Sequence, residues 1–177
     1  AGMVWVFLYA PGYGPINEAL NFLGLPRLDW LYDSKWALPA IILMSIWKYS
    51  GYFMLILLAA LKLVPSDLYE AARLDGVGPV SRLLHITVPL ISPTLYFVIV
   101  IGLLHSYQIF DYVYVMTQGG PADSTNVLTF YIYQNGFQYQ DIGYASTIAN
   151  TLLIFVLGLI GLVALTLGRR VHYMGER

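Results

Sequence analysis

Cysteine is absent from this chain of 177 residues. Without a thiol, the chain cannot form a disulfide, bind a metal through a thiolate or use a cysteine nucleophile. Charge is also scarce, since 11% of the residues are charged, against about 25% in a soluble domain. The net charge of -1 provides no positive field to attract nucleic acid. What remains is 58% hydrophobic, with a mean hydropathy of +0.66, which is typical of a protein embedded in a lipid bilayer.

Motifs for an intrinsic reaction are missing as well. None of the three lysines lies in a G-x-x-x-x-G-K-[ST] sequence, so the chain has no phosphate-binding loop of that type. The histidines, His85, His105 and His172, are too far apart to show metal-ligand spacing. No G-x-S-x-G sequence marks a serine nucleophile. We therefore expect no catalytic residue, no metal site and no enzyme activity in this chain.

Three apolar runs are each long enough to cross a bilayer, which takes about 20 helical residues. They cover residues 39–62, 92–116 and 144–167. The opening, residues 1–10, is apolar but too short to span, and it has the character of the end of a longer membrane helix. We therefore expect an all-α polytopic membrane protein, with residues 1–177 forming a single transmembrane domain that is truncated at its N-terminus.

A charged, helix-forming segment, residues 64–90, separates the first two runs. Ser66 can cap a helix at its start, and Gly76 can supply the positive φ that ends it. A second short helix is expected over about residues 80–86. The segment therefore predicts a helix–turn–helix projection at a membrane surface.

This segment carries the spacing E-A-A-x3-G-x9-I-x-L-P, which resembles the EAA loop of ATP-binding-cassette (ABC) importer permeases. The matching residues are Glu70, Ala71, Ala72, Gly76, Ile86 and Pro89, and Val88 stands where leucine is usual. Further stretches resemble the sugar-type branch of that family, among them Phe110-Asp111, Gly119-Gly120-Pro121 and Gly143-Tyr144-Ala145. The resemblance covers nearly every residue. It implies the C-terminal part of a six-helix type I transmembrane domain.

The same resemblance implies a function and a set of partners. The chain would be a permease subunit that moves a sugar or related polyol across a bacterial or archaeal cytoplasmic membrane by alternating access. ATP would be bound by separate ATPase subunits, so the permease itself needs no cofactor. A second, different permease and an extracytoplasmic solute-binding protein are expected as partners. The residues expected to couple to the ATPase are Glu70, Ala71, Ala72, Asp75, Gly76, Ile86 and Pro89.

Basic residues predict the orientation in the membrane. Arg73 and Arg82 lie in the segment 64–90, and the C-terminal tail holds three more arginines, whereas residues 117–143 contain no basic residue. Because basic residues favour the cytoplasmic side, the EAA-like loop and the C-terminus are expected in the cytoplasm. Residues 117–143 are then expected outside.

Polar side chains inside the apolar runs indicate the route of the passenger, because such groups are costly unless they face protein or water. Along each run they gather on one face, at a depth between the middle and the outer half of the membrane. Hydroxyl, amide and aromatic groups at one level suit a sugar. We expect Tyr49, Tyr52, Gln108, Tyr112 and Asn150 to line the route. The alternative is that they form interhelical hydrogen bonds, worth about 0.6 kcal/mol each.

Other readings stay open at this point. An importer for glycerol phosphate or an amino acid is one, although a phosphate passenger should favour an intramembrane arginine, and the apolar runs contain none. A secondary transporter or channel is another, with Lys48 and Asp111 as its coupling-ion site. Lys48 could also extend toward the membrane surface or pair with Asp111. A membrane enzyme or structural subunit has no catalytic pattern to support it.

Overall fold

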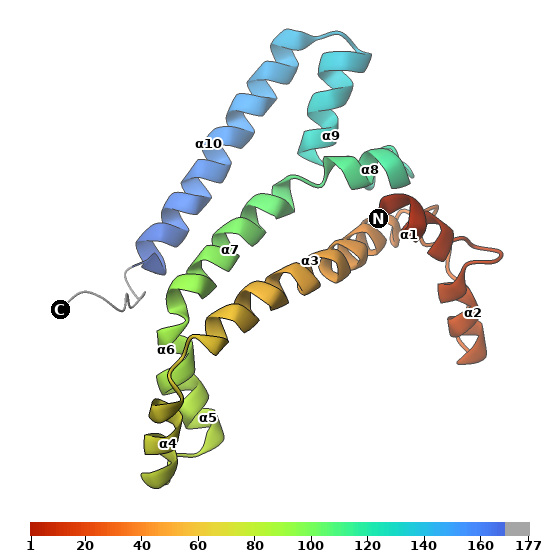
Figure 1. Ribbon diagram of the computed structural model, residues 1–177. Coiled ribbons are helices and arrows are strands. Elements are labelled where there is room, and N and C mark those ends of the chain that lie inside the picture. The colour runs from red at the N-terminus through yellow and green to blue at the C-terminus, as the bar shows by residue number, and fades with distance from the viewer. Residues whose placement is uncertain (169–177) are drawn as a thin grey trace. The chain divides into compact units, whose positions relative to one another are not determined.

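The computed structural model describes residues 1–168, and this part of the chain is built from helices without strands (Figure 1). The all-α fold predicted from the sequence is therefore confirmed. In chain order the helices are α1 (Gly2–Leu8), α2 (Pro15–Phe22), α3 (Ala37–Lys62), α4 (Ser66–Leu74), α5 (Pro79–Arg82), the π-helix η1 (Leu83–Thr87), α6 (Val88–Leu90), α7 (Ser92–Tyr107), α8 (Phe110–Met116), α9 (Leu128–Tyr133), the π-helix η2 (Gln134–Gln138) and α10 (Ile142–Thr166).

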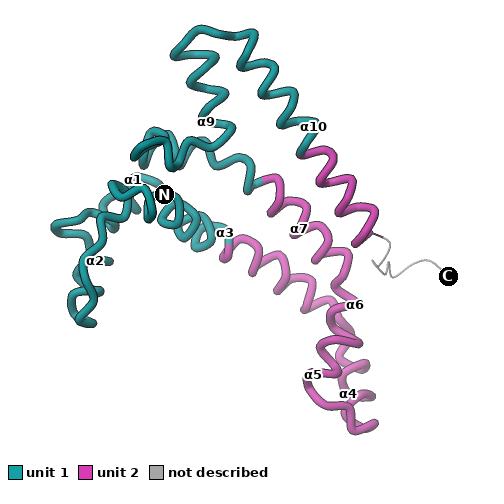
Figure 2. The backbone as a smooth tube through the Cα atoms, turned by 180° about the vertical axis from the view of Figure 1, so that it is seen from behind, with its two compact units in different colours: residues 1–49, 105–155 teal, residues 50–104, 156–177 magenta. Residues whose placement is uncertain are grey.

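The chain forms two compact units (Figure 2). Unit 1 contains residues 1–49 and 105–155, and unit 2 contains residues 50–104 and the chain from residue 156. Each of the helices α3, α7 and α10 contributes one portion to each unit. Unit 2 also holds α4 to α6, and unit 1 holds α1, α2, α8 and α9.

Unit 1 has a compact apolar core to which α3 contributes one face. Ala37, Ala40, Ile41 and Met44 are fully buried, and their spacing places them on the same side of the helix. The last three belong to a cluster that also contains Tyr9, Val113 and Phe130. Tyr9 follows α1, Val113 lies in α8 and Phe130 lies in α9. The hydroxyl of Tyr9 also donates a hydrogen bond of 3.0 Å to the carbonyl oxygen of Ala40. The start of α3 is thus held by both apolar packing and a buried polar contact.

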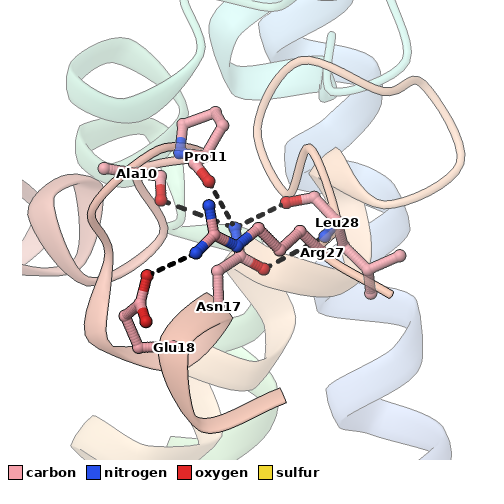
Figure 3. Close-up of polar contacts among 6 residues, drawn as sticks. All are labelled: Ala10, Pro11, Asn17, Glu18, Arg27 and Leu28. Carbon is pink, nitrogen blue, oxygen red and sulfur yellow. Dashed lines mark hydrogen bonds and ion pairs between the residues drawn. The ribbon is translucent and has the colours of Figure 1, made fainter. Parts of the chain in front are cut away.

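One buried asparagine organises the segment before α3 (Figure 3). Asn17, in α2, is 1% exposed, and its amide nitrogen donates to the carbonyl oxygen of Leu28 at 2.9 Å. Its amide oxygen accepts from the backbone N–H of Leu28 at 3.0 Å and from Nε1 of Trp30 at 3.1 Å. On the surface nearby, Arg27 forms a 2.7 Å ion pair with Glu18. A single side chain therefore satisfies both backbone groups of a loop residue that would otherwise lack partners.

Three helical stretches of the described chain are long and apolar enough to cross a membrane, Ala37–Lys62, Ser92–Met116 and Ile142–Thr166. Few of their apolar side chains are buried, as expected for surfaces that face lipid or other protein. The second stretch is not one continuous helix. It is interrupted at Gln108 and Ile109, between α7 and α8 (Figure 1).

The connection between α8 and α10 has an internal framework of its own. The hydroxyls of Thr117 and Thr125 are 2.7 Å apart, and Thr125 also donates to the carbonyl oxygen of Gly120 at 2.7 Å. Within it, α9 is followed directly by η2. The connection is therefore a folded element of unit 1.

Candidate functional site

The segment with the EAA-like spacing folds as two short helical arms in unit 2. The first arm is α4, and the second is the run α5, η1 and α6. Between them the backbone of Gly76 adopts φ of +72°, a conformation that favours glycine. The positive φ predicted for Gly76 is therefore confirmed.

Backbone hydrogen bonds define how α4 ends. The N–H of Val77 donates to the carbonyl oxygen of Ala72 at 2.9 Å, and the N–H of Gly76 donates to that of Arg73 at 3.1 Å. This pair of bonds is the Schellman motif, which uses the last carbonyls of a helix and requires a left-handed residue after it. The turn direction is thus set by the backbone of Gly76.

A side-chain contact joins the two arms. The hydroxyls of Tyr69 in α4 and Thr87 in η1 are 2.9 Å apart and partly buried. Thr87 also approaches the carbonyl oxygen of Arg82 at 3.5 Å. The sequence analysis did not predict this contact. The two residues lie eighteen positions apart, and no motif in the sequence links them.

Two details differ from the sequence prediction. Ser66 does not cap α4, since it is the first residue of that helix and its hydroxyl lies 3.3 Å from the carboxylate of Asp67. The second arm begins at Pro79 and extends beyond residue 86, through a π turn in which the N–H of Val88 donates to the carbonyl oxygen of Leu83. Because Pro89 cannot donate a hydrogen bond, an ordinary α-helix would be interrupted there, and the wider π turn carries the chain across.

The predicted coupling residues occupy different environments on this projection. Glu70, Ala71, Asp75 and Gly76 are exposed, Ile86 and Pro89 are half-buried, and Ala72 is buried. Glu70 forms no ion pair within the described chain. Its carboxylate is therefore available to a partner, whereas Ala72 serves packing within the projection.

The projection also exposes apolar side chains that the sequence analysis did not single out. Leu74, the last residue of α4, is 90% exposed, and the others with large exposed areas are Leu68, Val80, Leu83 and Leu84. A cluster of exposed apolar residues on a monomer marks an interaction surface. The sequence feature that could have indicated this surface is the presence of several leucines in the charged segment 64–90.

Two of the residues predicted to line the passenger route lie together in unit 1. The hydroxyls of Tyr49 in α3 and Tyr112 in α8 are 3.5 Å apart. Lys48 donates a hydrogen bond to the Tyr112 hydroxyl, and the ring of Tyr49 stacks on that of His105 with 4.7 Å between centroids. Helices α3, α7 and α8 thus each contribute to one polar cluster.

The remaining predicted route residues are not part of this cluster. Gln108 is exposed and lies in the break between α7 and α8, so its position does not follow the continuous helix assumed from the sequence. Asn150 is exposed on α10. Tyr52 belongs to unit 2, where its ring lies 5.4 Å from that of Phe53.

A cavity of about 390 Å³ opens in unit 1 beside the break. It is lined by Ser106, Tyr107, Ile109, Asn126, Val127, Leu128, Thr129 and Leu152. The side-chain oxygens of Asn126 and Thr129 are buried without a hydrogen-bond partner in the described chain. Ile109, one of the two residues of the break, is part of the lining, so the interruption of the helix lies at the wall of this cavity.

Lys48 is the costliest polar group of the cluster. A lysine near the centre of a membrane helix costs about 2.5–3.5 kcal/mol on insertion scales. The suggested pairing with Asp111 is wrong for the described chain, in which the ion pair is that of Arg27 with Glu18. The ammonium group is held instead by the Tyr112 hydroxyl and lies over the rings of Tyr112 and Tyr49, at 4.8 and 5.4 Å from their centroids.

Comparison with known proteins identifies the family. Residues 2–171 match the family described as binding-protein-dependent transport system inner membrane component. The chain belongs to this family. The resemblance inferred from the EAA-like spacing is therefore confirmed, and the chain is an inner-membrane permease component of a family whose members serve transport.

Two curated permeases are clearly similar to this one. The sulfoquinovosyl glycerol transport system permease protein SmoG of Agrobacterium fabrum is 40% identical over 149 residues, which are 84% of this chain and 48% of that protein. The sn-glycerol-3-phosphate transport system permease protein UgpA of Pectobacterium atrosepticum is 36% identical over 176 residues, 98% of this chain and 59% of that protein. The permease chain thus spans about half the length of the curated relatives it matches.

Solved structures show the same fold. A bacterial ABC transporter involved in import of the acidic polysaccharide alginate matches with a TM-score of 0.83 and 26% identity, over 99% of this chain and 60% of that one. A second structure, of a bacterial alginate ABC transporter in complex with an alginate pentasaccharide-bound periplasmic protein, matches with a TM-score of 0.73 and 28% identity, over 94% and 58%. The permease therefore has the transmembrane fold of an ABC importer.

Proposed function

We propose that this permease moves a sugar or polyol derivative across the cytoplasmic membrane by alternating access, powered by separate ATPase subunits. The observation that carries the proposal is the two-armed projection between α3 and α7. It is compact, braced by the Tyr69–Thr87 contact, and it exposes a carboxylate together with several apolar side chains. Such a body can dock on a partner and transmit rigid movement into the adjoining helices.

Glu70 and Leu74 are the proposed contact residues of the projection. An exposed glutamate can pair with a basic residue of the ATPase, and an exposed leucine can enter an apolar pocket. Gly76 acts through the turn that it permits. ATP is bound by the partner in this proposal, so the permease itself has no cofactor and no catalytic group.

The orientation follows from the same proposal. The projection faces the cytoplasm, and the connection containing α9 and η2 faces outward, where a solute-binding protein delivers the passenger. Arg73 and Arg82 on the projection support this orientation. The other arginines used in the prediction, Arg169, Arg170 and Arg177, lie outside the described residues. A second, different permease completes the route in this proposal.

The passenger class is supported by the relatives, which are named for sulfoquinovosyl glycerol and sn-glycerol-3-phosphate transport. Both solutes are derivatives of glycerol or a sugar. Within the permease, Tyr49 and Tyr112 supply hydroxyls and ring faces in one place, which suits the hydroxyls and C–H faces of a carbohydrate. Tyr52, Gln108 and Asn150 remain proposed lining residues.

Photo-cross-linking of the assembled transporter tests this function. A benzophenone amino acid is placed at Leu74, and in a matched variant at Phe137 of η2, which is also strongly exposed. We expect the Leu74 probe to capture an ATPase subunit and the Phe137 probe to capture none. If the Leu74 probe captures no ATPase subunit, the proposal is wrong.

A further inference from the structure

Lys48 lies deep within its helix. It is about 16 Å along α3 from Ala37 and about 21 Å from Lys62, at 1.5 Å of rise per residue. An extended lysine side chain reaches neither end of the helix from there. The ammonium group therefore stays at the level of the polar cluster formed with Tyr49, Tyr112 and His105.

The direct contacts of this ammonium are polar and aromatic, and the carboxylate of Asp111, which acts electrostatically on the neighbouring Tyr49, lies beyond ion-pair distance of Lys48. Its contacts are the Tyr112 hydroxyl and the faces of two tyrosine rings, and no carboxylate of the described chain lies within ion-pair distance. Tyr112 is itself 8% exposed, so the group that orients the ammonium is fixed by packing. Phenol rings attract a cation but do not neutralise its charge.

We infer that Lys48 is the anion-binding group of the passenger route, and that the passenger is an acidic carbohydrate or polyol, bearing a phosphate, sulfonate or carboxylate. This inference rests on the proposed function. An ammonium has three donors, and Tyr112 accepts one, which leaves two for the acid group. Intramembrane arginine is not required, because lysine binds phosphate as a point charge.

The neighbouring rings complete the site. The stacked rings of Tyr49 and His105 belong to α3 and α7. The face of such a ring can pack against the C–H face of a sugar. The acid group and the carbohydrate body would thus contact different members of one cluster. A neutral sugar would use the rings but leave the charge of Lys48 without its partner.

Protection from acetylation provides the test. The complete transporter in nanodiscs is treated with an amine-acetylating reagent, and the modification of each lysine is followed by peptide mass spectrometry. The probes are sn-glycerol-3-phosphate against glycerol, and D-glucuronate against D-glucose. Lys35 and Lys62 serve as internal controls, because they lie before α3 and at its end.

We expect both acidic probes to slow acetylation of Lys48 severalfold, while neutral probes leave it unchanged and the control lysines show no difference. Equal protection by neutral and acidic probes would overturn the inference. So would equal acetylation of Lys48 with and without the acidic probes, because a bound acid group at the ammonium should shield it. Neither result would change the expected cross-linking of Leu74 to the ATPase. The proposed function and this inference can therefore fail independently.

Substitution adds a functional measurement. We expect Lys48→Met to reduce uptake of the acidic passenger about ten- to a hundredfold, since hydrogen bonds to charged groups are strong. Lys48→Arg should retain most uptake, and Lys35→Met, which removes the same charge elsewhere, should behave as wild type. Uptake by Lys48→Met equal to that of wild type would overturn the inference.

Discussion

Replacing Gly76 by alanine tests how the projection keeps its shape. A Cβ at this position would meet no atom within 4 Å, so the change introduces no clash. The cost comes from the backbone, which has φ of +72°, where an L-residue with a Cβ is strained by about 1–2 kcal/mol. The variant should therefore loosen the end of α4 without altering packing.

Gly78 provides a matched control two residues away. Its surroundings are equally open, but its φ of -68° and ψ of 160° suit any residue. Both substitutions reduce the freedom of the unfolded chain alike, which favours folding by about 0.4–1 kcal/mol. The difference between Gly76→Ala and Gly78→Ala thus isolates the backbone strain of about 1–2 kcal/mol.

Hydrogen exchange measures this difference in the assembled transporter. The amides of Gly76 and Val77, which donate to carbonyls of α4, should exchange about five- to thirtyfold faster in Gly76→Ala than in Gly78→Ala. Gly76→Asn should lie between them, because asparagine tolerates the left-handed conformation. We expect uptake per ATP hydrolysed to fall in the same order. Equal exchange in the two alanine variants would refute the reasoning.

Three further predictions follow from single contacts. A double-mutant cycle of Tyr69→Phe and Thr87→Val, measured by denaturation, should give a coupling energy of about 0.5–1.5 kcal/mol. A coupling energy near zero would mean that the contact between the two hydroxyls does not stabilise the projection. Asn17→Ala should destabilise unit 1 by about 2–4 kcal/mol, because the N–H of Leu28 and Nε1 of Trp30 lose their acceptor. Asn21→Ala, which changes an exposed asparagine one turn later in the same helix, should change the denaturation midpoint little. Leu74→Ser should leave stability within about 0.5 kcal/mol of wild type. It should nevertheless weaken ATPase binding severalfold in a titration, whereas Phe22→Ser, equally exposed on α2, should not.

The fold class and the place of the projection could be predicted from the amino-acid sequence. Long uncharged runs admit few structures other than membrane helices, because a bilayer offers backbone groups no partner. Gly76 lies two residues before the pair Gly78-Pro79, which favours a turn at this point. The positive φ of Gly76 confirms the turn. These features are local, so a pattern of neighbouring residues is enough to reveal them.

The contacts between residues that are distant in the sequence became known only from the folded chain. The contact of Tyr69 with Thr87, the hub at Asn17 and the ammonium of Lys48 on Tyr112 each join parts of the chain that no local pattern relates. The break at Gln108 was also not predicted from the sequence. Hydropathy gives the length of an apolar run but does not show whether its helix is continuous. Side-chain partners are chosen by packing between helices, and that choice depends on the whole arrangement.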